Sequence, residues 1–311
     1  MEILVWTLIL AAGIALLVKG ADWFVCGASE LAGKLGIPPL VVGLTVVAMG
    51  TSLPEAAVSI SAVMKGNAAI TIGNVVGSNI LNILIILGLS AAVTTLAVKT
   101  NTVKYELPFL TGTSILLLIQ GLDGSIGFAD GMVLVILFGL YLCYLFIPVK
   151  KKGGADGTGA VTQRSGKTWK VILLCISGLA MTVAGSGLAV DAACAIAERL
   201  GMSERFIGLT IVALGTSLPE LVTSVTAAKK GKPDIAIGNI VGSNIFNILF
   251  VVGISSLIRP VAFAEGFRFD SAVSAAAALL LIVFCAGRKK LRRWHGAAML
   301  LGYVLYFGAI V

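Results

Sequence analysis

Charged residues are scarce in this chain, and their scarcity excludes the commonest class of protein. Only 12% of its 311 residues are charged, whereas 58% are hydrophobic and the mean hydropathy is +1.03. A soluble globular protein carries about 25% charged residues. The chain is therefore not expected to fold as a water-soluble globule. At roughly 20 apolar residues per membrane-spanning helix, its length allows about ten spans with short loops.

Histidine, paired cysteines and an N-terminal cleavage signal are also lacking. The chain has one histidine and five cysteines, and no two cysteines form a Cys-x-x-Cys pair. The cysteines lie in or beside apolar segments, where they are expected to serve as small packing residues. No small-residue cleavage site follows the first apolar run, so this run is expected to be the first span. The net charge of +8 is compatible with nucleic-acid binding, but in a membrane protein it more often records orientation, and no nucleic-acid partner is expected.

The apolar segments predict an all-α integral membrane protein with ten transmembrane helices. Only residues 150–168 resemble a linker, because they are basic, glycine-rich and without periodicity. This segment is expected to join two halves of five spans each, residues 1–149 and 169–311. The spans are expected near residues 3–19, 39–64, 69–93, 106–121, 126–147, 169–190, 206–228, 235–258, 271–287 and 295–311.

Two polar motifs each occur twice. Residues 43–55 read GLTVVAMGTSLPE, and GLTIVALGTSLPE follows 165 positions later. Residues 73–83 read GNVVGSNILNI, which returns as GNIVGSNIFNI with the same offset of 165. The two copies define a first and a second repeat, which cover about residues 39–93 and 206–258.

The distribution of lysine and arginine predicts the orientation. One alternating set of loops, together with the linker, holds 18 of the 23 cationic residues. Because cytoplasmic loops are enriched in these residues, the linker is expected inside the cell and both termini outside. An odd number of spans in each half then inverts the second half relative to the first. Inverted repeats with a substrate site at their interface are typical of secondary transporters.

Each GTSLPE motif places polar groups inside an apolar helix. Pro54 lacks an amide proton and its ring obstructs the carbonyl four residues back, so the helix is expected to kink or open there. Carbonyls freed near residues 45–48 would be costly in lipid but useful as cation ligands. Hydroxyl, carboxylate and amide groups at helical spacing share one face. These polar stripes are Thr51, Ser52, Glu55, Asn74, Ser78 and Asn82 in the first repeat, and Thr216, Ser217, Glu220, Asn239, Ser243 and Asn247 in the second.

The ligand types predict what such stripes bind. They offer carboxylate, amide, hydroxyl and backbone oxygen, without thiolate or imidazole. Oxygen ligands suit hard cations such as calcium, which takes about 6–8 of them, whereas zinc and copper are not expected. Two carboxylates about 6 Å apart repel by roughly 3 kcal/mol at an effective dielectric constant near 20, and burial adds several kcal/mol per ion. An empty site is therefore costly to occlude, which predicts an exchanger.

Neutral polar residues in these stripes also have a structural interpretation. Serine, threonine and asparagine often hold membrane helices together. We prefer this interpretation for Asn79 and Asn244, and we prefer ligation for Asn82 and Asn247 because these two extend the stripes. Glycines at seven-residue spacing in the first span, matched in the sixth, predict close helix packing or a sliding face.

GTSLPE followed by GNxxGSNxxN, twice and in opposite orientation, resembles the α-repeats of the cation/calcium exchanger superfamily, especially those of compact prokaryotic sodium/calcium exchangers. The resemblance covers essentially the whole chain and implies that spans 2, 3, 7 and 8 hold the ions while spans 1 and 6 move. Several family members carry aspartate where this chain has Asn247, which leaves two carboxylates here instead of three. By family position the ligands are Ala48, Thr51, Ser52, Glu55, Ser78 and Asn82, with Ala213, Thr216, Ser217, Glu220, Ser243 and Asn247, the alanines through backbone carbonyls.

The function expected from these features is a secondary active antiporter of the cell membrane that exchanges sodium for calcium by alternating access. The nearest alternative is a calcium/proton or other cation/proton antiporter, since protons also neutralise buried carboxylates. A cation channel would need a continuous pore with weak multi-site binding, whereas inverted repeats with one charged site favour alternating access. An intramembrane hydrolase would need a buried histidine or paired aspartate to activate the serine of the short motif Gly185-Ser186-Gly187, and the sequence shows neither. The expected partners are calcium and sodium ions and the lipid bilayer, with a functional monomer, no cofactor and no enzymatic activity.

Overall fold

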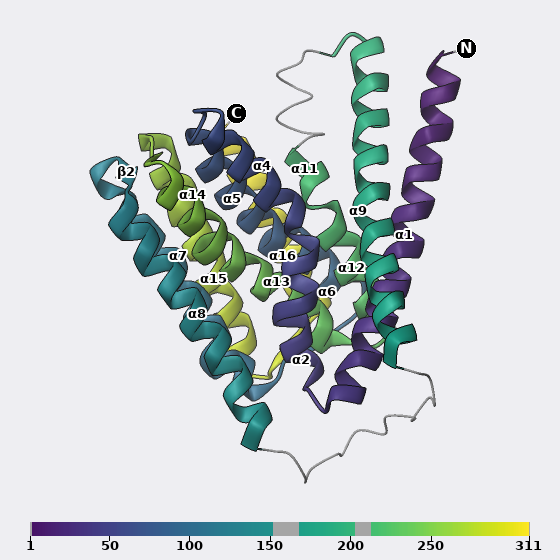
Figure 1. The fold of residues 1–311 in the computed structure, drawn as a ribbon, viewed down its shortest axis with the longest axis horizontal. Helices are drawn as coiled ribbons and strands as arrows, with labels where there is room; N and C mark the ends of the chain where they lie inside the picture. The colour runs from purple at the N-terminus through teal and green to yellow at the C-terminus, as the bar shows by residue number, and fades with distance from the viewer. Residues whose placement is uncertain (1, 152–167, 203–212, 311) are drawn as a thin grey trace.

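The computed structural model describes residues 2–151, 168–202 and 213–310, and these residues are almost entirely helical (Figure 1). The first half begins with one long helix and continues with helices that contain wide π-helical turns. Its elements are α1 (Glu2–Leu35), α2 (Pro39–Val42), η1 (Gly43–Val47), α3 (Ala48–Thr51), α4 (Leu53–Met64), α5 (Ala69–Ile80), η2 (Leu81–Leu87), α6 (Gly88–Val93), β1 (Leu96–Ala97), η3 (Thr102–Glu106), α7 (Leu107–Gln120), η4 (Gly121–Asp123), β2 (Ser125–Ile126) and α8 (Phe128–Lys151).

The second half has a similar order of helices and strands, without counterparts of η3 and η4 among the described residues. Its elements are α9 (Thr168–Arg199), α11 (Ala213–Thr216), α12 (Leu218–Lys229), α13 (Pro233–Phe246), η6 (Asn247–Val252), α14 (Gly253–Ile258), β3 (Val261–Ala262), α15 (Glu265–Ala286), β4 (Lys290–Leu291) and α16 (Arg293–Ile310). The linker predicted at 150–168 lies mostly outside the described residues, as does the start of the span predicted at 206–228.

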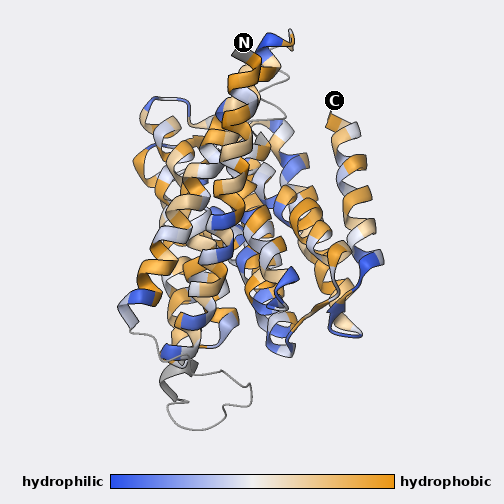
Figure 2. Cartoon of the chain, turned by 90° about the vertical axis from the view of Figure 1, so that its right-hand side faces the viewer, coloured by the Kyte–Doolittle hydropathy of each residue, from blue (hydrophilic) through white to orange (hydrophobic). Residues whose placement is uncertain are grey.

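Seven of the described helical segments are long and apolar enough to cross a membrane, and an eighth is obtained when the bent pair 39–51 and 53–64 counts as one span. Figure 2 shows hydrophobic residues along most of the length of the helices, with hydrophilic residues at many of their ends and at some positions midway. The span predicted at 295–311 forms α16, which is not among the seven because Arg293 and His295 lower the hydropathy of its first turn. The structure therefore supports a multi-pass helical membrane protein, and the number ten stays a prediction.

The two longest helices, α1 and α9, lie side by side and antiparallel (Figure 1). Glycines make the contact: a Cβ on Gly20 would lie 2.5 Å from the backbone nitrogen of Thr182, and one on Gly27 would lie 2.9 Å from that of Cys175. Both helices extend well beyond the predicted spans 3–19 and 169–190. The prediction ended too early because it stopped at the polar residues, whereas polar groups on α1 have partners in the fold. Asp22 on α1, for example, pairs with Lys230 at 2.5 Å.

Two short β-ladders relate the halves. Strand β1 pairs with β4 through Leu96 and Leu291, and β2 pairs with β3 through Ile126 and Val261. Adding the repeat offset of 165 to Leu96 gives Val261, and adding it to Ile126 gives Leu291. One ladder therefore maps onto the other when the halves exchange places. In each half, the helices that carry the polar motifs directly precede the first strand of that half, β1 or β3.

Both GTSLPE helices are interrupted at the serine. The segment 39–51 and helix α4 are bent by 48° relative to each other, and Ser52 between them has φ −84° and ψ 8°. Ser217 takes the matching position between α11 and α12, with φ −88° and ψ 3°. The proline two residues later cannot donate a backbone hydrogen bond, which favours the break predicted from the sequence. Each break creates a new helix N-terminus with a glutamate in its first turn.

Candidate cation site

Glu55 and Glu220 are the two carboxylates of the motif cores, and neither side chain has any exposed surface. Glu55 lies in the first turn of α4 and Glu220 in the first turn of α12. Each of these helices has 12 residues, and the partial positive charge of a helix N-terminus favours a carboxylate there. The interruption of the helix thus places a buried negative charge where the backbone partly compensates it.

Serines from each repeat bind the glutamate of the other repeat. The Ser52 hydroxyl donates to Glu220 Oε1 at 2.8 Å, and the Ser217 hydroxyl donates to Glu55 Oε1 at 3.3 Å. Ser78 lies 3.1 Å from the Ser217 hydroxyl and donates to Glu55 Oε1 at 3.5 Å. The carboxylates and hydroxyls therefore form two groups, Ser52 with Glu220 and Ser217 and Ser78 with Glu55, and each group joins residues of both repeats.

Four asparagines form a further connected group, which the Asn247 amide links to the Ser78 hydroxyl at 3.5 Å. The Asn79 side-chain amide donates to the Asn244 backbone carbonyl at 3.2 Å, and the Asn244 amide donates to the Asn79 carbonyl at the same distance. The Asn82 amide donates to Asn244 Oδ1 at 2.8 Å, while the Asn247 amide donates to Asn79 Oδ1 at 3.2 Å. The interpretation of Asn79 and Asn244 as residues that hold helices together agrees with these bonds.

These bonds leave four buried oxygens without a hydrogen-bond donor. They are Glu55 Oε2, Glu220 Oε2, Asn82 Oδ1 and Asn247 Oδ1, one carboxylate and one amide from each repeat. Buried polar atoms are normally hydrogen-bonded, because an unsatisfied one costs about 1–3 kcal/mol and more when it is charged. An ionised carboxylate oxygen and an amide carbonyl oxygen both accept only, so a cation is the kind of group that satisfies all four. The arrangement fits a hard cation as transported substrate.

The other predicted ligands take varied positions. The Thr51 hydroxyl lies 3.1 Å from Asn239 Oδ1 and 3.1 Å from the Val47 carbonyl, which are alternative acceptors for its one proton. The Ala48 carbonyl, predicted to be free, instead accepts the Ser52 backbone N–H at 3.0 Å and the Ser243 hydroxyl at 3.3 Å. Free carbonyls were expected near residues 45–48, but the helix is interrupted one turn later, at Ser52. The Ala48 carbonyl therefore still accepts a helical hydrogen bond.

Thr216 and Ala213 are the last and first residues of α11, a short helix that directly follows the part of the chain outside the description. Thr216 is half-buried, and its position before the break at Ser217 matches that of Thr51 before Ser52. These two residues are thus placed in the fold of the second repeat, and their role as ligands stays a prediction.

Asn74 and Asn239 support the glutamate-bearing helices. Asn74 donates to the Glu55 backbone carbonyl at 3.1 Å and to the Ser59 hydroxyl at 2.9 Å. Asn239 makes the matching bonds in the second repeat, to the Glu220 carbonyl at 3.4 Å and to the Ser224 hydroxyl at 2.9 Å. The spacing of the polar stripes indicated that these residues share a face, but not that they hold the neighbouring helix.

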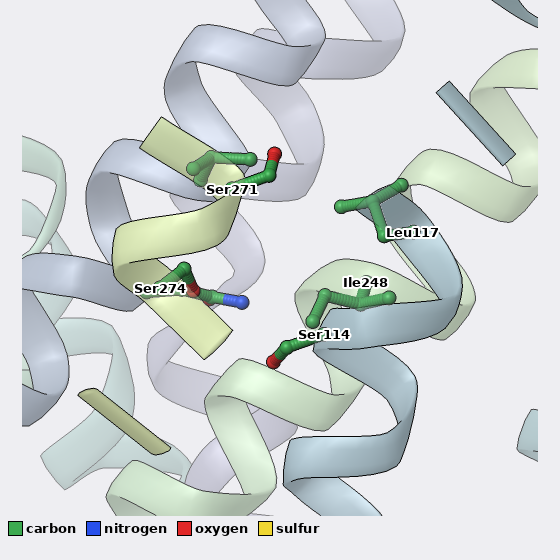
Figure 3. A pocket seen from close by; sticks show the side chains of 7 residues that line it. Ser114, Leu117, Ile248, Ser271 and Ser274 are labelled. Carbon is green, nitrogen blue, oxygen red and sulfur yellow. The ribbon is translucent and has the colours of Figure 1, made fainter. Parts of the chain in front are cut away.

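A narrow pocket borders the asparagine group between α7, α15 and η6. Figure 3 shows Ser114 and Leu117 of α7, Ile248 of η6 and Ser271 and Ser274 of α15 around it, and Asn79 also lines it. The pocket is too narrow to hold a water molecule. The complete burial of Glu55 and Glu220 shows that the carboxylates are closed off from solvent in this conformation.

Ser186, the serine of the Gly-Ser-Gly motif, does not take part in this site. Its hydroxyl donates to the Gly215 backbone carbonyl at 2.9 Å and so ties α9 to α11. Among the described residues, no group of three or more histidine, cysteine, aspartate or glutamate side chains is placed to hold a metal ion. The candidate site is therefore a two-carboxylate, oxygen-only site.

Comparisons with known proteins agree with this arrangement. The family model described as sodium/calcium exchanger protein matches residues 5–147 and 170–311. The putative antiporter CaxA of Alkalimonas amylolytica is 40% identical over 97% of this chain and 98% of its own, and the sodium/calcium exchanger MaX1 of Methanosarcina acetivorans is 33% identical over 96% of each. A structure of the sodium-calcium exchanger NCX_Mj, soaked with zero Na⁺ and Ca²⁺, matches with a TM-score of 0.87 and 35% identity over 99% of this chain and 100% of that one.

Proposed function

The chain belongs to the sodium/calcium exchanger family, a family of multi-pass membrane transporters, and from this premise we propose that it exchanges sodium for calcium at the Glu55–Glu220 site. The observation that carries the proposal is the set of four unpartnered buried oxygens contributed in pairs by the two repeats. Two ionised carboxylates have a formal charge of −2, which one calcium ion balances. The full proposed ligand set is the twelve residues that match the family motif.

The proposed mechanism follows from the cost of the empty site. A buried carboxylate pair without a cation is destabilised by desolvation and by mutual repulsion, so the closed conformation forms readily only around bound ions. Sodium ions or a calcium ion each supply the positive charge, and exchange results because the unloaded carrier does not change conformation. Alternating access in this form needs a site that opens to one side at a time, and the closed packing around Glu55 and Glu220 supports an occluded state.

The proposed topology is ten spans in two inverted halves, with the linker in the cytoplasm and both termini outside the plasma or inner membrane. Three observations support the inversion: the antiparallel contact of α1 with α9, the equivalence of the two β-ladders, and the reciprocal bonds between Asn79 and Asn244. The Asn79–Asn244 bonds join residues 165 positions apart, and the helix contact and the ladders relate matching elements of the two halves. A two-fold axis between the halves requires such pairs.

Reconstituted protein tests the proposal directly. Purified protein in liposomes loaded with sodium should accumulate calcium-45 when diluted into sodium-free buffer, and uptake should stop when the sodium gradient is collapsed with a sodium ionophore. A pH gradient imposed without sodium should not drive uptake. Uptake driven by the pH gradient alone would support the cation/proton alternative, in which protons clear the same carboxylates.

A further inference from the structure

A second buried carboxylate, Glu106, lies outside the candidate cation site. It ends the π-helical turn η3 and is only 4% exposed. Its Oε1 accepts a hydrogen bond from the Tyr144 hydroxyl at 3.4 Å, whereas its Oε2 is buried without a donor. The ion pairs between described residues do not include Glu106. The Glu106 carboxylate has no role in the proposed exchange of ions at Glu55 and Glu220.

Two further buried oxygens without partners belong to the same region. Thr102 begins η3, one turn before Glu106, and its hydroxyl is unpartnered with the residue 1% exposed. Tyr141 of α8 is 4% exposed, and its hydroxyl is also unpartnered. Helix α8 packs against this end of the α7 helix, since the rings of Tyr141 and Phe109 stack at 5.0 Å and those of Tyr144 and Tyr105 lie 6.4 Å apart. The carboxylate and the hydroxyls thus come from two adjoining helices.

The internal repeat indicates that the fold does not require this cluster. The positions 165 residues after Thr102 and Glu106 are Phe267 and Ser271, which lie in the regular α-helix α15 where the first half has the π-helical η3. The second half also has a carboxylate beside a tyrosine, since Asp270 accepts a hydrogen bond from the Tyr306 hydroxyl at 2.9 Å. Ser271, at the position equivalent to Glu106, has a buried hydroxyl without a partner but no carboxylate. π-Helical turns are often found at functional sites.

We propose that Glu106, Thr102 and Tyr141 bind one small monovalent cation, sodium or potassium, at a site that is not the transport site. Their oxygens are ligands for hard cations, and the single carboxylate has the charge that balances one monovalent ion. A proton would satisfy only Glu106 Oε2, whereas a cation satisfies the carboxylate and both hydroxyls together. The bound ion would join η3 to α8, and the proposal is independent of the transported substrates.

Thermal unfolding in detergent tests this site in a background that lacks the transport carboxylates. In the Glu55→Gln/Glu220→Gln protein, replacing choline chloride with sodium or potassium chloride at constant ionic strength should raise the Tm. At about ten times the dissociation constant the expected shift is roughly 2 °C or more. Adding Glu106→Gln should abolish the shift. Adding Asp270→Asn, the matched tyrosine-bonded carboxylate of the second half, should leave it intact.

Two near-isosteric variants test the site independently, in case the Glu106→Gln variant misfolds. Thr102→Val and Tyr141→Phe remove one hydroxyl each, and both should move the half-maximal cation concentration upward by about tenfold, since a lost ligand contributes about 1.4 kcal/mol. A Tm that does not respond to either cation in the parental background, or a response that survives Glu106→Gln, contradicts the proposal. A Tm that responds to pH but not to sodium or potassium also contradicts it, because it identifies Glu106 as a site for a proton only.

Discussion

Asn79 and Asn244 donate to each other's backbone carbonyl, each at 3.2 Å, across the interface of the two repeats. They occupy equivalent positions 165 residues apart, so this pair marks the point where the repeats meet. Each also accepts a hydrogen bond from a predicted ligand of the opposite repeat, Asn247 or Asn82. The amide NH₂ of each ligand is thereby engaged by the asparagine of the opposite repeat, and its carbonyl oxygen is left without a protein donor.

This arrangement predicts a specific coupling between Asn82 and Asn244. Asn244→Ala should weaken calcium binding because Asn82 loses the acceptor that orients its amide. In the Asn82→Ala background, however, Asn244→Ala should cause little further loss of calcium affinity. The coupling energy between the two substitutions in a double-mutant cycle should be at least about 0.5 kcal/mol. Equilibrium calcium-45 binding provides the dissociation constants. The pair Asn244→Ala and Asn74→Ala, whose side chains share no hydrogen bond, should be additive, and equal coupling in both cycles would argue against the orienting role.

Glu55→Gln and Glu220→Gln should each abolish sodium-driven calcium uptake while the protein stays folded. Glutamine keeps the shape and still accepts the serine hydroxyl, but it removes one of the two charges that offset dehydration of the cation. Loss of a buried charged partner costs about 3–5 kcal/mol, which corresponds to more than a 100-fold loss of affinity. Uptake in proteoliposomes and elution in size-exclusion chromatography are measured together. Near wild-type uptake by either variant would remove that glutamate from the ligand set.

Transport should require sodium but not potassium. Asn247 offers a cation only a neutral carbonyl oxygen, so the site charge is −2, and desolvation of an additional potassium ion would have to be met by neutral dipoles. Sodium-driven calcium flux should therefore be unchanged when choline replaces potassium on both sides of the vesicle. Flux that disappears in choline and returns with potassium would show that Asn247 does not set this selectivity.

The predicted topology assigns opposite ends of the molecule to opposite sides of the membrane. Asn67, between α4 and α5, is exposed and should face outside, whereas Asn101, directly before η3, is exposed and should face the cytoplasm. In a background without the native cysteines, Asn67→Cys should react with a membrane-impermeant maleimide added to intact cells, and Asn101→Cys should react only after permeabilisation. The reverse pattern would invert the orientation inferred from lysine and arginine.

The contact of α1 with α9 should not tolerate a side chain at Gly20. A Cβ there would lie 2.5 Å from the Thr182 nitrogen and 2.8 Å from the Gly178 carbonyl oxygen, so the two helices must separate. We expect Gly20→Ala to destabilise the protein by about 1–3 kcal/mol and to slow transport. Gly139→Ala on α8 is the control, because no atom lies within 4 Å of its added Cβ. Equal Tm values for the two variants would contradict the close packing.

The sequence by itself determined the composition-based class, the repeat and the residue types of the site. Low charge and long apolar segments predict a helical membrane protein because unpaired backbone polar groups are too costly in lipid. Pro54 predicts the break in its helix, since the missing amide proton and the ring clash act locally. The doubled motif places Glu55 and Glu220 at equivalent positions, so the residue types alone predict a two-carboxylate site for a hard cation.

Only the tertiary structure decided which of these polar groups bond to each other and which are left for an ion. A periodic stripe gives the face of a residue but not its partner on another helix, so the crossing of Ser52 to Glu220 and of Ser217 to Glu55 could not be predicted. The occupied Ala48 carbonyl and the continuation of α1 past Asp22 were missed for the same reason. Hydrogen bonds between segments 165 residues apart depend on how the two halves pack, and local sequence does not determine that packing.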